Sequence, residues 1–248
     1  MPLHMCDRWM CGAAIGYQSP PFHCLSCGVH FLRCVHAEWL LLRPRLTRTR
    51  LGVFLLALAI SLVWLQERGV DPVIVSLHAG ALGAVLGAGF MVGSGRDRAA
   101  FATALGHPTT PLAIAVGRWV AIAVPAIAVT LACTIPGGWQ PGAVVAGSTA
   151  ALAVAGCALV VVLAGGSGAA VALFLLMAIA GSVSPERLIG LAHPGALRVA
   201  AASVLELGPA LWHYRDVATG DLGAVLHGGA WAGLGIILAS GLIAWRRA

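Results

Sequence analysis

The sequence predicts an all-α integral membrane protein with six transmembrane helices. Hydrophobic residues make up 59% of the chain and charged residues only 10%. The mean hydropathy is +0.91, and such a composition is typical of proteins that sit in a lipid bilayer. The apolar residues are gathered in long runs, which turn residues or arginines separate. The expected spans are Leu51–Gln66, Pro72–Ser94, Pro111–Ile135, Pro141–Ala164, Gly168–Ser182 and Leu222–Trp245.

Residues 1–35 differ from the rest, so we divide the chain into this N-terminal leader and a membrane domain of residues 36–248. The leader holds two pairs of cysteines that are close in sequence, Cys6 with Cys11 and Cys24 with Cys27. Paired thiolates can hold zinc, but the first spacing is unusual and few residues would form a core. A disordered leader and a start codon assigned upstream of the true one are the alternatives, and we expect no metal site.

Residues 36–50 form a basic amphipathic segment before the first span. In this segment Trp39 and Leu42 alternate with Arg43 and Arg45. A helix with this pattern can lie in the headgroup plane of a membrane. An ordinary charged flank of the first span is the alternative.

The loop between the second and third spans predicts a short helix with both ends marked. Asp97 can cap the N-terminus, where backbone N–H groups and the helix dipole favour a carboxylate. Phe101 and Leu105 stand four residues apart and share a face. A Gly and a Pro then end the helix, and Thr110 can cap the third span. An apolar face on a helix outside the bilayer needs something to dock against.

The positions of the arginines predict the orientation. All fifteen basic residues are arginine, and cytoplasmic flanks of membrane proteins carry an excess of basic residues. With the N-terminus inside, the arginines on cytoplasmic flanks are Arg43, Arg45, Arg48, Arg50, Arg96, Arg98, Arg118, Arg246 and Arg247. Both termini and the short loop helix are therefore expected in the cytoplasm. Because the net charge of +6 sits beside the spans, it indicates topology and not nucleic-acid binding.

The absence of Lys and Asn suggests a GC-rich bacterial genome, so the expected location is the cytoplasmic (inner) membrane of a bacterium. On the outer side, residues 183–221 form a long loop. Its segment 196–207 is expected to be helical, either on the surface or as a re-entrant element. Arg118 lies near the start of its span and is expected to snorkel back to the cytoplasmic surface. His78 lies close to the outer face, and structural roles are preferred for both residues.

From about His36 to the C-terminus, these features together resemble the permease subunits of the type-2 ABC transporter family. The resemblance rests on their order along the chain: an amphipathic segment before the first span, a charged loop after the second, a long outer loop and a basic tail. The loop has Gly95-Arg96-Asp97-Arg98, then Leu105 and Pro108, and Gly117-Arg118 follows in the third span. The family usually has a Glu and a Gly-Thr in this loop, where the chain has Asp97 and Ala99-Ala100-Phe101.

The resemblance implies that residues 36–50 form an elbow helix and that the loop forms a coupling helix. The coupling helix would meet an ATP-binding cassette ATPase subunit. Its expected interface residues are Arg96, Asp97, Arg98, Phe101, Leu105, His107 and Pro108. The function expected from the resemblance is the membrane subunit of an ABC-type transporter, with export as the expected direction. A second permease copy, identical or similar, would complete the membrane part.

The chain is not expected to hydrolyse ATP or to carry a catalytic residue or a cofactor. Gly142 and Gly147-Ser148-Thr149 have part of the spacing of a phosphate-binding loop, but that loop needs a Lys, and the chain has none. Energy must therefore come from a partner.

Two other functions stay open. A rhomboid-like intramembrane serine protease would use Ser167 as nucleophile and His227 as base. Against it, the chain has no Asn to stabilise an oxyanion, and the predicted topology puts the two residues on opposite faces of the membrane. The other alternative is a membrane scaffold or assembly factor without a transport role.

Overall fold

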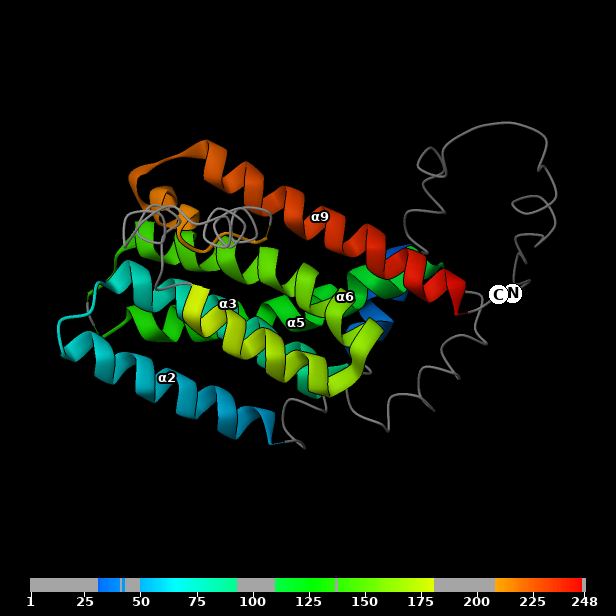
Figure 1. The fold of residues 1–248 in the computed structure, drawn as a ribbon, viewed down its shortest axis with the longest axis horizontal. Helices are drawn as coiled ribbons and strands as arrows, with labels where there is room; N and C mark the ends of the chain where they lie inside the picture. Colours follow the sequence, from blue (N-terminus) through cyan, green and yellow to red (C-terminus); the bar gives the residue numbers. More distant parts are fainter. Residues whose placement is uncertain are drawn as a thin grey trace, which may run out of the picture.

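The computed structural model describes residues 31–40, 42, 50–92, 110–136, 138–180 and 208–246. Within these residues every regular element is helical. Residues 31–40, which we call the 31–40 helix, come first. They are followed by α2 (Leu51–Glu67), α3 (Pro72–Met91), α5 (Pro111–Thr134), α6 (Pro141–Ala180), the 3₁₀ helix η1 (His213–Thr219) and α9 (Leu222–Trp245). Figure 1 shows the long helices lying alongside one another as a bundle, with η1 at one end.

The helices begin where the sequence places capping residues. Thr110 Oγ1 accepts a hydrogen bond from the Ala113 N–H at 3.3 Å, which confirms the predicted cap of α5. Asp71 caps α3 in the same way, and Asp221 caps α9 through the Gly223 N–H at 2.8 Å. Because such side chains satisfy backbone donors that no helical carbonyl reaches, they define where each helix starts.

The chain reverses direction inside α6. Gly166 has φ 72° and ψ −162°, a backbone conformation outside the helical region. In Figure 1 the part of α6 after this residue, drawn in yellow, runs back beside α3. A Cβ placed on Gly89 of α3 would lie 3.1 Å from the Ala170 Cβ, which locates the returning arm against α3. The reversal lies between the two segments that the sequence predicts as the fourth and fifth spans, and a separate membrane crossing by each arm stays a prediction.

Four described helices are long and apolar enough to cross a membrane: α3, α5, α6 and α9. The apolar helix α2 has 17 residues, about 25 Å at 1.5 Å per residue, which is short of a typical hydrocarbon core. The described helices therefore establish a membrane protein with four candidate spans. Six crossings remain a prediction.

The core of the bundle lies around α3, which contacts α2, α5 and α6 and is buried along most of its length. Glycines on α3 bring its neighbours close: Gly83 and Gly87 face Ala126 and Ile122 of α5, and Gly80 faces the Gly147 carbonyl of α6. In lipid, helices associate through such close van der Waals packing.

We call the two ends of the bundle the η1 end and the Gly166 end. At the η1 end, Arg215 pairs with Asp71 at 3.6 Å. At the Gly166 end, the Arg246 guanidinium donates a hydrogen bond to the Leu163 carbonyl, which joins the last turn of α9 to α6.

Candidate functional site

The 31–40 helix packs against α5 near the Gly166 end. A Cβ on Gly117 would lie 2.6 Å from the Glu38 Cβ and 3.2 Å from the Val35 carbonyl oxygen. Any larger residue at position 117 would therefore push the 31–40 helix away. The boundary that the sequence suggests between residues 35 and 36 falls inside this helix.

Arg118, the next residue of α5, forms an ion pair with Glu38. Its Nε lies 3.6 Å from Glu38 Oε2, and the two side chains are 6% and 10% exposed. The expectation that Arg118 snorkels to the surface is therefore wrong: its charge is compensated inside the protein by a carboxylate. Sequence analysis missed this role of Glu38. The available signal was one acidic residue in a basic segment, together with one arginine inside a span.

The same turn of α5 also contacts α6. Trp119 Nε1 donates a hydrogen bond to the Leu152 carbonyl at 3.1 Å. Three successive residues of α5 therefore contact two different elements: Gly117 and Arg118 contact the 31–40 helix, and Trp119 contacts α6. We call residues 117–119 the α5 junction.

Two of the residues that were expected to face the membrane surface are turned toward the bundle instead. Trp39 is half-buried against the core, and Leu42 is only 4% exposed. Arg43 and Arg45 lie outside the described residues. The face turned away from the bundle carries exposed residues, both apolar and basic: Leu32, Arg33, His36, Ala37 and Leu40.

The predicted coupling residues fall in the gap between α3 and α5. Arg96, Asp97, Arg98, Phe101, Leu105, His107 and Pro108 all lie outside the described residues. The structure describes only the two points from which this segment runs, the end of α3 at Val92 and the start of α5 at Thr110.

At the η1 end, five aromatic or imidazole side chains cluster between η1 and α9: Trp212, His213, Tyr214, His227 and Trp231. The His227 ring centroid is 5.7 Å from those of both His213 and Tyr214. Trp231 Nε1 donates to His227 Nε2 at 3.2 Å. Since Nε2 accepts this bond, neutral His227 carries its proton on Nδ1. The sequence showed Trp212-His213-Tyr214 as an aromatic run, but nothing local indicated that His227 would join it.

Several buried polar atoms of this cluster have no hydrogen-bond partner among the described residues. They are Trp212 Nε1, the Tyr214 hydroxyl and His227 Nδ1. Tyr214 is fully buried, and burial, followed by the neighbouring Cys157, raises the pKa of its phenol well above the usual range. The hydroxyl therefore stays protonated at neutral pH and is available as a donor.

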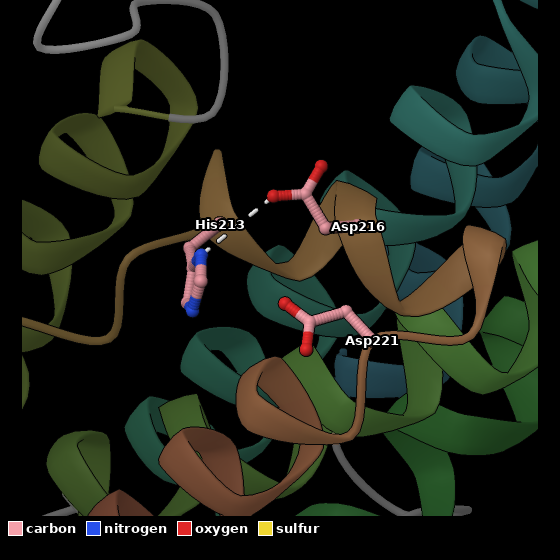
Figure 2. Close-up of side chains that lie close together, drawn as sticks. All are labelled: His213, Asp216 and Asp221. Carbon is pink, nitrogen blue, oxygen red and sulfur yellow. Dashed lines mark ion pairs between the residues drawn. The ribbon is translucent and has the colours of Figure 1, made fainter.

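Three possible metal ligands also meet at the η1 end (Figure 2). His213, Asp216 and Asp221 offer ligand atoms that all lie within 4.8 Å of one another. One imidazole and two carboxylates form a donor set that divalent metals accept. Each group has a structural role here, however: His213 Nδ1 pairs with Asp216 at 3.7 Å, and Asp221 caps α9. Both aspartates are exposed, and we assign no metal to them.

The structure also separates the two residues of the protease alternative. Ser167 follows the reversal at Gly166, at the end where Arg246 meets Leu163. His227 lies at the opposite end of α9, in contact with η1. The length of α9 between His227 and Arg246 is roughly 28 Å at 1.5 Å per residue. A serine and its base must lie within hydrogen-bond reach, so these two residues do not form a catalytic pair in this fold.

The chain matches no family model, no curated protein and no solved structure.

Proposed function

We propose that the protein is the membrane-spanning subunit of an ABC-type transporter and works as an exporter. The observation that supports this best is the position of the 31–40 helix. It packs on α5 through Glu38 and Gly117, within the first two turns after the start of α5. The ends of the predicted coupling segment, Val92 and Thr110, belong to this same end of the bundle.

In this proposal the 31–40 helix is the start of the elbow, and residues 93–109 supply the coupling helix. The protein spans the inner membrane of a bacterium six times, with both termini and the Gly166 end in the cytoplasm. A separate ATPase subunit binds the coupling helix, and a second permease copy completes the membrane part. The substrate crosses where the two copies meet.

The coupling helix is the part of the proposal to test first. In the predicted coupling helix, Phe101 and Leu105 would share one face, and an aromatic anchor in a groove is typically a hot spot whose truncation costs about 2 kcal/mol or more. We expect Phe101→Ala to lose most of the ATPase in a pull-down from cells that co-express a candidate ATP-binding cassette subunit from the same genome. Arg98→Ala should retain the ATPase, with the largest loss at low salt, because rim charges act mainly on association.

Membrane insertion and monodispersity of each variant are the controls for this experiment. Equal ATPase retention by wild type, Phe101→Ala and Arg98→Ala would contradict the coupling-helix assignment. A wild-type permease that never retains an ATPase would contradict the transporter proposal as a whole and favour a scaffold.

A further inference from the structure

We propose that Glu38 and Arg118 clamp the 31–40 helix to α5, so that the two elements move as one body. Glu38 is then a positioning residue that sets where the N-terminal helix sits on the bundle. The clamp follows from the geometry alone. The part of the inference that concerns movement rests on the proposed function.

The first support is the burial of the ion pair. Glu38 and Arg118 are the two most buried charged residues in the described part of the chain, and they face each other at 3.6 Å. Removing one partner of an ion pair in poorly solvated surroundings is strongly destabilising, because the remaining buried charge loses its nearest opposite charge. An exposed pair such as Arg215 with Asp71 contributes far less.

The second support is the fit around the pair. Gly117 leaves room for the Glu38 side chain at a distance that no other residue would allow. On the same helix, Trp39 packs against the core. The opposite face has only exposed residues such as Leu32, Arg33 and Leu40. The 31–40 helix is therefore held to the bundle from one side, around the ion pair.

The third support is the α5 junction itself. Because Trp119 is bonded to the Leu152 carbonyl, the turn that holds Glu38 is also fixed to α6. The position of the 31–40 helix is thus fixed relative to both α5 and α6. Any tilt of α5 at this level would carry the 31–40 helix with it.

Cys34 provides a reporter for the clamp. It lies one helical turn before Glu38 and is partly buried. Burial raises the pKa of its thiol, and the Glu38 carboxylate raises it further. Trypsin cuts after Arg33 and after Arg45, and the peptide between these sites contains no other cysteine. Its alkylation by a soluble maleimide can therefore be followed by mass spectrometry in the full-length protein.

We expect Arg118→Gln to raise the alkylation rate of Cys34 several-fold in purified protein at neutral pH. Glu38 stays in this variant, so the contribution of its carboxylate to the thiol pKa stays too. A faster reaction then reports exposure of the 31–40 helix, which gives the maleimide access to the thiol and removes the burial that raises the thiol pKa. Arg215→Gln is the matched control, because it removes an arginine from an exposed ion pair at the η1 end. That control should alkylate at the wild-type rate.

Exchange of the two charges separates a clamp from ordinary packing. Glu38→Arg combined with Arg118→Glu should return the rate to near the wild-type value, because attraction between the two side chains is restored. A wild-type rate in Arg118→Gln would overturn the clamp. If Arg118→Gln aggregates, the exchanged pair decides: recovery of monodisperse, slowly alkylated protein supports the clamp, and continued aggregation contradicts it.

Movement as one body is tested in the complex with the ATPase. During ATP turnover, Cys34 of the wild-type complex should stay as protected as it is without ATP, whereas Arg118→Gln should become still more reactive. A several-fold rise in the wild type under turnover would overturn the joint movement. If the wild type binds no ATPase, the proposed function fails, while the result on the purified permease still decides the clamp.

Discussion

At the scale of single residues, the close packing of α3 on α6 depends on glycines that have no room for a side chain. A Cβ on Gly147 would lie 2.5 Å from both the Ser76 carbonyl oxygen and Thr130 Cγ2. Both of these partners are fully buried, so neither can turn away into lipid. Because interiors are close-packed, an added methyl group would have to separate the two helices.

Gly147→Ala should therefore destabilise the protein, and the control Gly229→Ala should not. Overpacking of this kind typically costs about 1–3 kcal/mol, whereas a Cβ on Gly229 would meet nothing within 4 Å. The measurement is the temperature at which half of the detergent-purified protein loses its monodisperse peak. We expect a drop of several degrees for Gly147→Ala. The same midpoint for both variants would mean that α3 and α6 do not pack as closely as described.

At the scale of elements, helix boundaries were predictable and contacts between helices were not. Proline or a capping side chain marks the start of α3, α5 and α9, and the glycines around Gly166 mark the reversal in α6. These signals are local, so a sequence pattern contains them. The pairing of Glu38 with Arg118 joins residues that are far apart in the chain. Nothing near either residue in the sequence specifies its partner.

The contacts at the η1 end could not be predicted from the sequence for the same reason. Trp212, His213 and Tyr214 are adjacent in sequence, but His227 reaches them only because α9 folds back along η1. Likewise, the pattern around Trp39 and Leu42 indicated an amphipathic helix without showing which face would meet the bundle. Packing determines which face of the 31–40 helix meets the bundle, because Gly117 and the buried Arg118 of α5 contact the face that carries Glu38.

Gly166 allows an element-level test of the reversal. Its φ of 72° with ψ of −162° is a conformation that is essentially restricted to glycine. A Cβ there would meet nothing within 4 Å, so Gly166→Ala should cost backbone strain of about 1–3 kcal/mol without any clash. Gly168→Ala, also in open space but without a positive φ, is the control and should keep the wild-type thermal midpoint. Equal midpoints for both alanine variants would indicate that α6 does not need the observed turn.

At the scale of the whole molecule, charge is divided between the two ends of the bundle. The described acidic residues other than Glu38 lie at the η1 end: Glu67, Asp71, Asp216 and Asp221. Arg68 and Arg215 lie at the η1 end as well, whereas Arg50 and Arg246 lie at the Gly166 end, next to the predicted cytoplasmic segments. Apart from the Glu38–Arg118 pair, the helical interior between the ends has no charged side chain in the described part of the chain. This distribution fits a bilayer around the bundle, and the excess of arginine predicts which end is inside.

Two cysteine variants on α6 and its flank test this orientation. Gln140 lies exposed just before α6 at the η1 end, and Ser167 lies exposed just after the reversal at the Gly166 end. In intact bacterial cells, a membrane-impermeant maleimide should label Gln140→Cys, whereas Ser167→Cys should be labelled only after the cells are permeabilised. The wild-type protein gives the background from its native cysteines.

The opposite labelling pattern would place the Gly166 end outside the cell. Because α3 ends and α5 begins at that end, the segment between them would then also lie outside, away from cytoplasmic ATP. A cytoplasmic ATPase could not bind that segment, and the transporter proposal would fail with the topology. Labelling of both variants in intact cells would instead mean that the first arm of α6 does not cross the membrane. The pattern expected here places the Glu38–Arg118 pair and the predicted coupling residues on the cytoplasmic side, where the proposed function requires an ATPase to bind.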